Sequence, residues 1–119
     1  MTDNDNDNGG GVKIYKVHDL LIKDCSIDNN TVSSNGGGLD IGRSTVTIAN
    51  TIIDSNTASN GGGGIYADED EDNSCFTEIY DSTITNNKAI NKDGGGLYLL
   101  CDNNLVASIT NTTIASNTA

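Results

Sequence analysis

The 119-residue sequence has no tryptophan, no proline and one phenylalanine. Only 34% of its residues are hydrophobic and 4% are aromatic, so a globular core would contain few large side chains. Basic residues are also scarce: six lysines and arginines stand against 17 aspartates and glutamates, and the formal net charge is −11. Nucleic acid is therefore not expected as a partner, because binding it requires clustered basic side chains. No apolar run approaches the ~18 residues of a membrane span, so membrane insertion is not expected either.

What the sequence does have is a repeated glycine motif. Three glycines followed by alternating apolar residues occur at 9–14, 36–41, 62–67 and 94–99. Each copy has a companion that ends in Ile-x-x-Asn, at 20–30, 46–56, 77–87 and 107–117. An element that recurs every 26 to 32 residues indicates a solenoid. We expect a polar acidic leader (1–8) and one domain (9–119) with repeats at about 9–35, 36–60, 61–93 and 94–119.

The alternation within each copy predicts short strands with one buried face. Stacking the repeats in register places apolar residues in three inward columns. The columns are Val12, Leu39, Ile65 and Leu97; Ile22, Ile48, Ile79 and Ile109; and Ile27, Ile53, Ile84 and Ile114. A fourth column, Asn30, Asn56, Asn87 and Asn117, is expected to form an amide ladder inside a turn. We therefore predict an all-β fold, a right-handed parallel β-helix of about four rungs with no evident capping helices.

The Gly-Gly-Gly-hydrophobic motif followed by Ile-x-x-Asn resembles the paired glycine-rich and FxxN repeats of polymorphic outer membrane proteins. The resemblance covers about residues 9–119. It implies a right-handed parallel β-helix region of a bacterial surface adhesin or autotransporter, located at the cell surface. The sequence departs from the family pattern in having isoleucine, at positions 27, 53, 84 and 114, where the family favours phenylalanine.

The two ends of the repeat array look complementary. Exposed strand edges invite pairing, and no amphipathic capping helix is evident at either end. Residues 114–119 stop where a further repeat would need a polar turn and three glycines, which residues 1–11 supply. We expect an extracellular structural protein whose subunits stack head to tail into a surface filament, a homopolymer. The alternative is a segment of a longer adhesin β-helix. The predicted assembly interface consists of Val12, Ile14, Ile22, Ile27, Leu97, Leu99, Ile109 and Ile114.

Two other functions compete with a structural one. Tyr66 and Tyr98 fall at equivalent outward positions, and such a stacked pair could bind a sugar ring, as in a carbohydrate-binding β-helix for surface polysaccharide. A lyase is disfavoured, and no enzymatic activity is expected. Lys13 and Asp40 are predicted to form an ion pair but do not bring an acid, a base and a metal together. The single histidine, His18, has no serine or cysteine partner in register.

Acidic residues and cysteines leave two questions open. Asp3, Asp5 and Asp7 alternate as at the start of a calcium loop, but the later ligand positions of an EF-hand are missing. Asp68, Asp70 and Asp72 lie in a five-acid run that either is solvated or bridges a cation, so Ca²⁺ is the one cofactor considered. Cys25 takes the slot of Thr51, Ser82 and Thr112 and is expected to pack inward. Cys75 and Cys101 are candidates for a disulfide across a rung.

Overall fold

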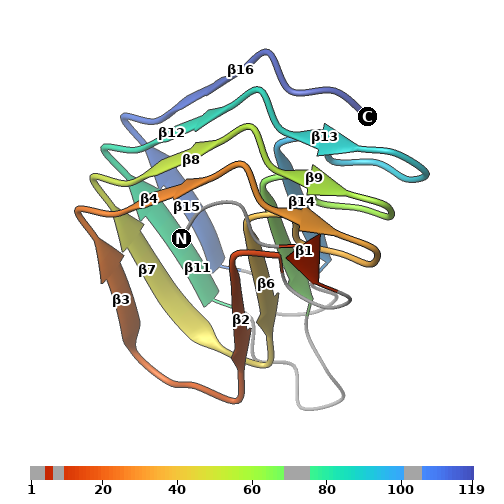
Figure 1. Cartoon of the computed structure of the whole chain (residues 1–119). Coiled ribbons are helices and arrows are strands. Elements are labelled where there is room, and N and C mark those ends of the chain that lie inside the picture. The colour runs from red at the N-terminus through yellow and green to blue at the C-terminus, as the bar shows by residue number, and fades with distance from the viewer. Residues whose placement is uncertain (1–4, 7–9, 69–75, 101–105) are drawn as a thin grey trace.

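A computed structural model describes residues 5–6, 10–68, 76–100 and 106–119, and these form a parallel β-solenoid (Figure 1). We call each circuit of the chain a rung: rung 1 holds β2–β5, rung 2 β6–β9, rung 3 β10–β13 and rung 4 β14–β16. No helix occurs among the described residues, and therefore none that is long and apolar enough to cross a membrane.

The rungs stack so that their strands form four parallel sheets. Sheet 1 contains β2 (Val12–Tyr15), β6 (Leu39–Gly42), β10 (Ile65–Asp68) and β14 (Leu97–Leu100). Sheet 2 contains β3 (Leu20–Lys23), β7 (Thr45–Ala49), β11 (Phe76–Tyr80) and β15 (Val106–Thr110). Sheet 3 contains β4 (Ser26–Asp28), β8 (Ile52–Asp54), β12 (Thr83–Thr85) and β16 (Thr113–Ala115). Sheet 4 contains the two-residue strands β1 (Asp5–Asn6), β5 (Thr31–Val32), β9 (Thr57–Ala58) and β13 (Lys88–Ala89).

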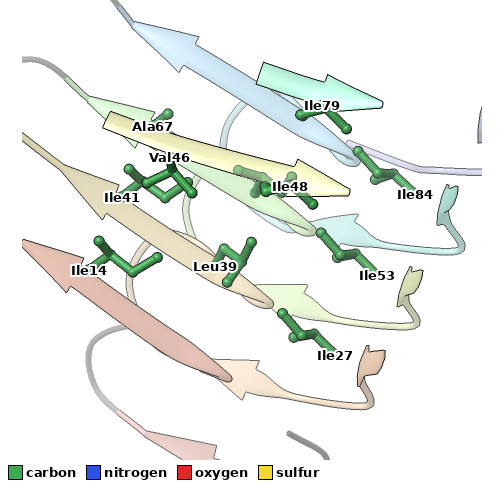
Figure 2. Close-up of a cluster of buried hydrophobic side chains, with 11 residues drawn as sticks. Ile14, Ile27, Leu39, Ile41, Val46, Ile48, Ile53, Ala67, Ile79 and Ile84 are labelled. Atoms are coloured by element: carbon green, nitrogen blue, oxygen red, sulfur yellow. The ribbon is translucent and has the colours of Figure 1, made fainter. Parts of the chain in front are cut away.

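The predicted inward columns are confirmed by the strand register. Leu39 pairs with Val12 and Ile65, Ile48 with Ile22 and Ile79, and Ile53 with Ile27 and Ile84. The core lies between sheets 1, 2 and 3, where side chains of different rungs stack on one another (Figure 2). Burial is complete in the middle: Ile48 and Ile53 are 0% exposed, whereas Ile109 and Ile114 in rung 4 are 43% and 44% exposed.

A column of asparagines joins the rungs at the turn after sheet 3. Asn30, Asn56 and Asn87 are fully buried. The side-chain oxygen of Asn56 accepts the backbone N–H and the side-chain amide of Asn30, each at 3.0 Å. The side-chain nitrogen of Asn56 donates to Oδ1 of Asn87 (3.0 Å) and to the carbonyl of Ile27 (2.9 Å). Asn87 repeats this arrangement with Asn117 and Ile53, so the buried amides meet the requirement for hydrogen-bond partners without water.

The glycine motif forms the tight corner between sheets 4 and 1. Gly36 has a φ of +69°, in the left-handed region that glycine adopts without steric cost. A Cβ on Gly38 would lie 2.7 Å from the carbonyl oxygen of Gly64, and one on Gly37 would collide with the carbonyl of Gly63. Because the backbones of successive rungs approach so closely here, larger residues do not fit.

Part of the acidic leader joins the fold. Asp5 pairs with Thr31 and Asn6 with Val32, so β1 extends sheet 4 by one strand below rung 1. No apolar residue in this segment predicts a strand. A parallel ladder needs only backbone groups in register, and an open strand edge offers them to any segment that can reach it.

Truncating an isoleucine should lower the free energy of unfolding strongly only where the side chain is on the inward face of a strand. Ile53→Ala removes a fully buried side chain from β8 and should lower the free energy of unfolding by about 2–5 kcal/mol. Its neighbour Ile52 is 51% exposed, so Ile52→Ala is the matched control and should change stability by less than about 1 kcal/mol. Urea unfolding monitored by circular dichroism measures both, and equal losses would contradict the assigned register.

The asparagine column predicts a second stability difference. Asn56→Ala removes the acceptor of two Asn30 hydrogen bonds and the donor to the Ile27 carbonyl, and should lower the free energy of unfolding by at least about 2 kcal/mol. Asn91→Ala, at an exposed position, is the control and should be nearly neutral. The same urea titration tests both variants, and an Asn56→Ala protein as stable as the control would show that the column is dispensable.

Candidate functional site

The outward face of sheet 1 contains the residues that the sequence analysis singled out for ligand binding. Lys13, Asp40, Tyr66 and Tyr98 occupy one column, because each is in register with the next. Lys13 Nζ lies 3.7 Å from Asp40 Oδ2, which gives the predicted ion pair. The Tyr66 and Tyr98 rings stack with centroids 5.3 Å apart and planes 6° apart.

A groove of about 260 Å³ crosses this face beside the tyrosine stack. Its floor is Asp40 and Gly42 of rung 2, and its two sides are Lys13 and Tyr15 of rung 1 and Tyr66 and Asp68 of rung 3. Ile14, Ser34 and Asn35 complete the lining. The groove exists because rung 2 carries an aspartate in register with Tyr66 of rung 3 and a glycine in register with Tyr15 of rung 1.

Electrostatics in the groove favour protonated groups. Burial raises the pKa of Asp40 above its usual value and Asp68 adds to this, while Lys13 opposes it. Burial, followed by the charge of Asp68, raises the pKa of Tyr66 to about 12. The Tyr66 hydroxyl lies 3.5 Å from Oδ2 of Asp68, to which it donates a hydrogen bond.

A column of hydroxyl groups lines the corner between sheets 2 and 3. Thr51 and Ser82 each donate to the carbonyl two residues earlier, at 2.8 and 2.9 Å. Each also accepts the backbone N–H of the residue one rung below, which is Cys25 for Thr51 and Thr51 for Ser82. Cys25 takes the first slot of this column, with Sγ 3.1 Å from the Lys23 carbonyl, but it is exposed. The expectation that Cys25 is buried inside the solenoid was wrong. Cys25 lies in rung 1, at the end of the column, and is covered from one side only.

Aspartate and asparagine alternate on the outside of the same corner. Asp24, Asn50, Asp81 and Asn111 all have positive φ values, which these residue types tolerate. Asn50 donates to Asp24 at 2.6 Å and Asn111 donates to Asp81 at 2.5 Å. At the next corner, the pKa of Asp54 is lowered by hydrogen bonds from Thr85, Ser55 and Asn86. The companion segments of the sequence already carry an aspartate or asparagine at the position of Asp24 in every repeat, and the structure adds the hydrogen bonds between neighbours.

The predicted assembly residues divide into two groups. Ile14 and Ile27 are 4% and 2% exposed, so they belong to the core and offer little surface to a partner. The other six lie at the two ends of the solenoid. Val12, Ile22, Leu97 and Leu99 are partly buried against the core, and Ile109 and Ile114 are exposed.

The predicted metal and disulfide residues fall mostly outside the described part of the chain. Asp3, Asp7, Asp70, Asp72, Cys75 and Cys101 all lie there. Asp5 is in β1, and Asp68, at the end of β10, lines the groove. Within residues 5–6, 10–68, 76–100 and 106–119, no group of three or more histidines, cysteines or acidic residues is arranged to hold a metal ion.

Comparison with known proteins bears on the repeats. The model of the Chlamydia polymorphic membrane protein repeat matches two segments, 50–68 and 81–100. Each matched segment begins at the corner before sheet 3, includes one asparagine of the buried column and one glycine motif, and ends in sheet 1 of the next rung. No curated protein and no solved structure matches the chain. Both matched segments are similar to polymorphic membrane protein repeats, and they follow one another along the parallel solenoid, from rung 2 into rung 3 and from rung 3 into rung 4.

Proposed function

We propose that this chain is a structural β-helix segment of a cell-surface adhesin or autotransporter passenger. The observation that supports the proposal most is the pair of repeat matches at 50–68 and 81–100, one rung apart in the solenoid. In such a segment, stability comes from stacked inward columns, and each added rung lengthens a rod that carries outward side chains away from the cell.

The distribution of residues between the inward and outward faces of the strands supports a role in presenting outward side chains to the surroundings. Inward positions repeat the same kind of residue, as in the column of Ile27, Ile53 and Ile84. Outward positions of sheet 1 do not: Lys13, Asp40 and Tyr66 are in register and chemically unlike. Stability therefore does not restrict the outward chemistry. Catalysis has no part in this proposal, and calcium-dependent depolymerisation of a polysaccharide by the purified chain would count against it.

The proposed location predicts that the chain is accessible on intact cells. Antibodies raised against the purified chain should label unpermeabilised cells of the organism that produces it, and a protease added outside should remove the label. An antibody against a cytoplasmic protein, which should label only after permeabilisation, is the control. Labelling of this chain that also required permeabilisation would overturn the proposal.

A second candidate is the stacking of subunits end to end, which the two ends of the solenoid favour. At the lower end of rung 1, an apolar cavity of about 300 Å³ is lined by Val12, Leu20 and Ile27, with Leu21, Ile22, Cys25 and Ser26. At the upper end, Ile109 and Ile114 of rung 4 are exposed. These residues continue the same columns, so a second copy placed on rung 4 in register would put isoleucine on isoleucine.

Strand β1 restricts this stacking. Asp5, Thr31, Thr57, Lys88 and Thr118 share one column of sheet 4 through successive pairings. A second copy stacked in register would bring its own Asp5 to the position that Thr118 of the first copy occupies. Stacking therefore requires that β1 leave sheet 4. While β1 is paired with β5, it opposes assembly.

Removing the leader should accordingly promote stacking. The chain without residues 1–8 should form higher oligomers at concentrations where the full chain sediments as a monomer, and more so at high salt, which screens subunits of net charge −11. Adding Ile114→Lys to the shortened chain should abolish the effect, whereas adding Ile52→Lys, on an outward face, should not. Sedimentation velocity and negative-stain microscopy measure this, and monomers under all conditions would exclude stacking.

A further inference from the structure

The groove on sheet 1 has the dimensions of a missing ring in an aromatic stack. Tyr98 and Tyr66 stack at equivalent positions of rungs 4 and 3, and the next position, in rung 2, is Asp40. Neighbouring strands lie about 4.8 Å apart, so a ring above Asp40 would meet Tyr66 at a distance close to that of the tyrosine pair. The second face of Tyr66 therefore borders an opening about one ring thick.

Lys13 lies directly across Asp40 from Tyr66, and the ring of Tyr15 borders the opening two residues further along the strand of rung 1, beside Gly42. Tyr15 of rung 1 is in register with Gly42 and is 51% exposed. Its ring lies 3.1 Å from the position of a Cβ on Gly42, so a side chain at this position would press against it. Lys16 Nζ and Arg43 Cζ lie 5.3 and 5.5 Å from the centre of the same ring and help to position it.

Polar groups surround the opening in the way that a sugar requires. Asp40 and Asp68 supply carboxylate oxygens, which accept hydrogen bonds from hydroxyl groups. Asn35 adds an amide whose oxygen is already held by the Gly61 N–H at 3.1 Å. A volume of about 260 Å³ is slightly below the roughly 300 Å³ at which cavities for drug-sized ligands begin, so the groove accommodates one ring rather than a long ligand.

We propose that this groove binds one sugar ring of a neutral polysaccharide, stacked on the face of Tyr66 that is turned away from Tyr98. A sugar ring combines an apolar face for the tyrosine with a rim of hydroxyl groups for the carboxylates. Two aspartates and one lysine line the groove, and this excess of acidic groups, together with the net charge of −11, disfavours uronic acids and sulfated sugars. The inference does not rest on the proposed cell-surface location, because purified protein tests it.

Affinity electrophoresis of the purified chain tests the proposal. Native gels contain dextran, galactomannan or mixed-linkage β-glucan, and binding is measured as retarded migration relative to a gel without polysaccharide. At least one of the three should retard the wild-type chain, and polygalacturonate should not. Tyr66→Ala should weaken binding roughly tenfold or more, the scale of losing a central aromatic contact.

Two further variants locate the site. Asp40→Tyr fills the opening with a ring from the chain itself, so it should abolish retardation while leaving unfolding by urea unchanged or shifted to higher concentration. Tyr80→Ala removes a half-buried tyrosine from sheet 2 and should bind like wild type. Absence of retardation by all three neutral polysaccharides would overturn the proposal. Equal retardation of the wild type and Asp40→Tyr would overturn the assignment to this groove.

Discussion

The hydrogen bond between backbone groups of successive rungs is the interaction on which the rest of this structure depends. Val12 N–H donates to the Gly38 carbonyl and Leu39 N–H to that of Gly64, each at 2.9 Å, and the same step recurs around every rung. Parallel pairing in register places each side chain beside its own equivalents, above and below. At the buried positions, a residue type is therefore suitable if it packs or forms hydrogen bonds well with its own kind, as isoleucine and asparagine do. Carboxylates do not, and at one corner they alternate with asparagine, so that Asn50 separates Asp24 from Asp81.

This constraint explains which parts of the fold could be predicted from sequence. The inward columns and the buried asparagines recur at fixed positions of each repeat, so a comparison of four short segments was enough to predict them. The groove could not be found in that way. It forms because Asp40 is smaller than Tyr66 in the rung above and Gly42 is smaller than Tyr15 in the rung below. Outward positions do not repeat from rung to rung, so no pattern predicts such a difference. Strand β1 was missed for a related reason: Asp5 and Asn6 pair through their backbone, and their side chains give no periodic signal.

Repetition also has a consequence for the ends of the solenoid. The columns that bury Ile48 and Ile53 completely leave Ile109 and Ile114 nearly half exposed, because burial in a solenoid is supplied by the neighbouring rung. Any strand segment that pairs in the same register can cover this exposed end, and covering it is favourable. The pairing of β1 with β5 illustrates this, since a segment without apolar side chains still occupies the edge of sheet 4.

The separation between the two faces of each strand determines how this fold can acquire a binding site. A globular protein usually forms a pocket by diverting loops, whereas a solenoid needs only to omit a side chain from one outward position. Because rungs are about 4.8 Å apart, one omission opens a space about as thick as a ring, bordered by the side chains of the two adjacent rungs. Asp40 makes such an omission beside Tyr66, and Gly42 makes one beside Tyr15, in two neighbouring columns of sheet 1. Its cost in stability is small, since the residues concerned face away from the core. In the proposed site, the contacts to a ligand and the stability of the fold thus depend on different residues of the same strand.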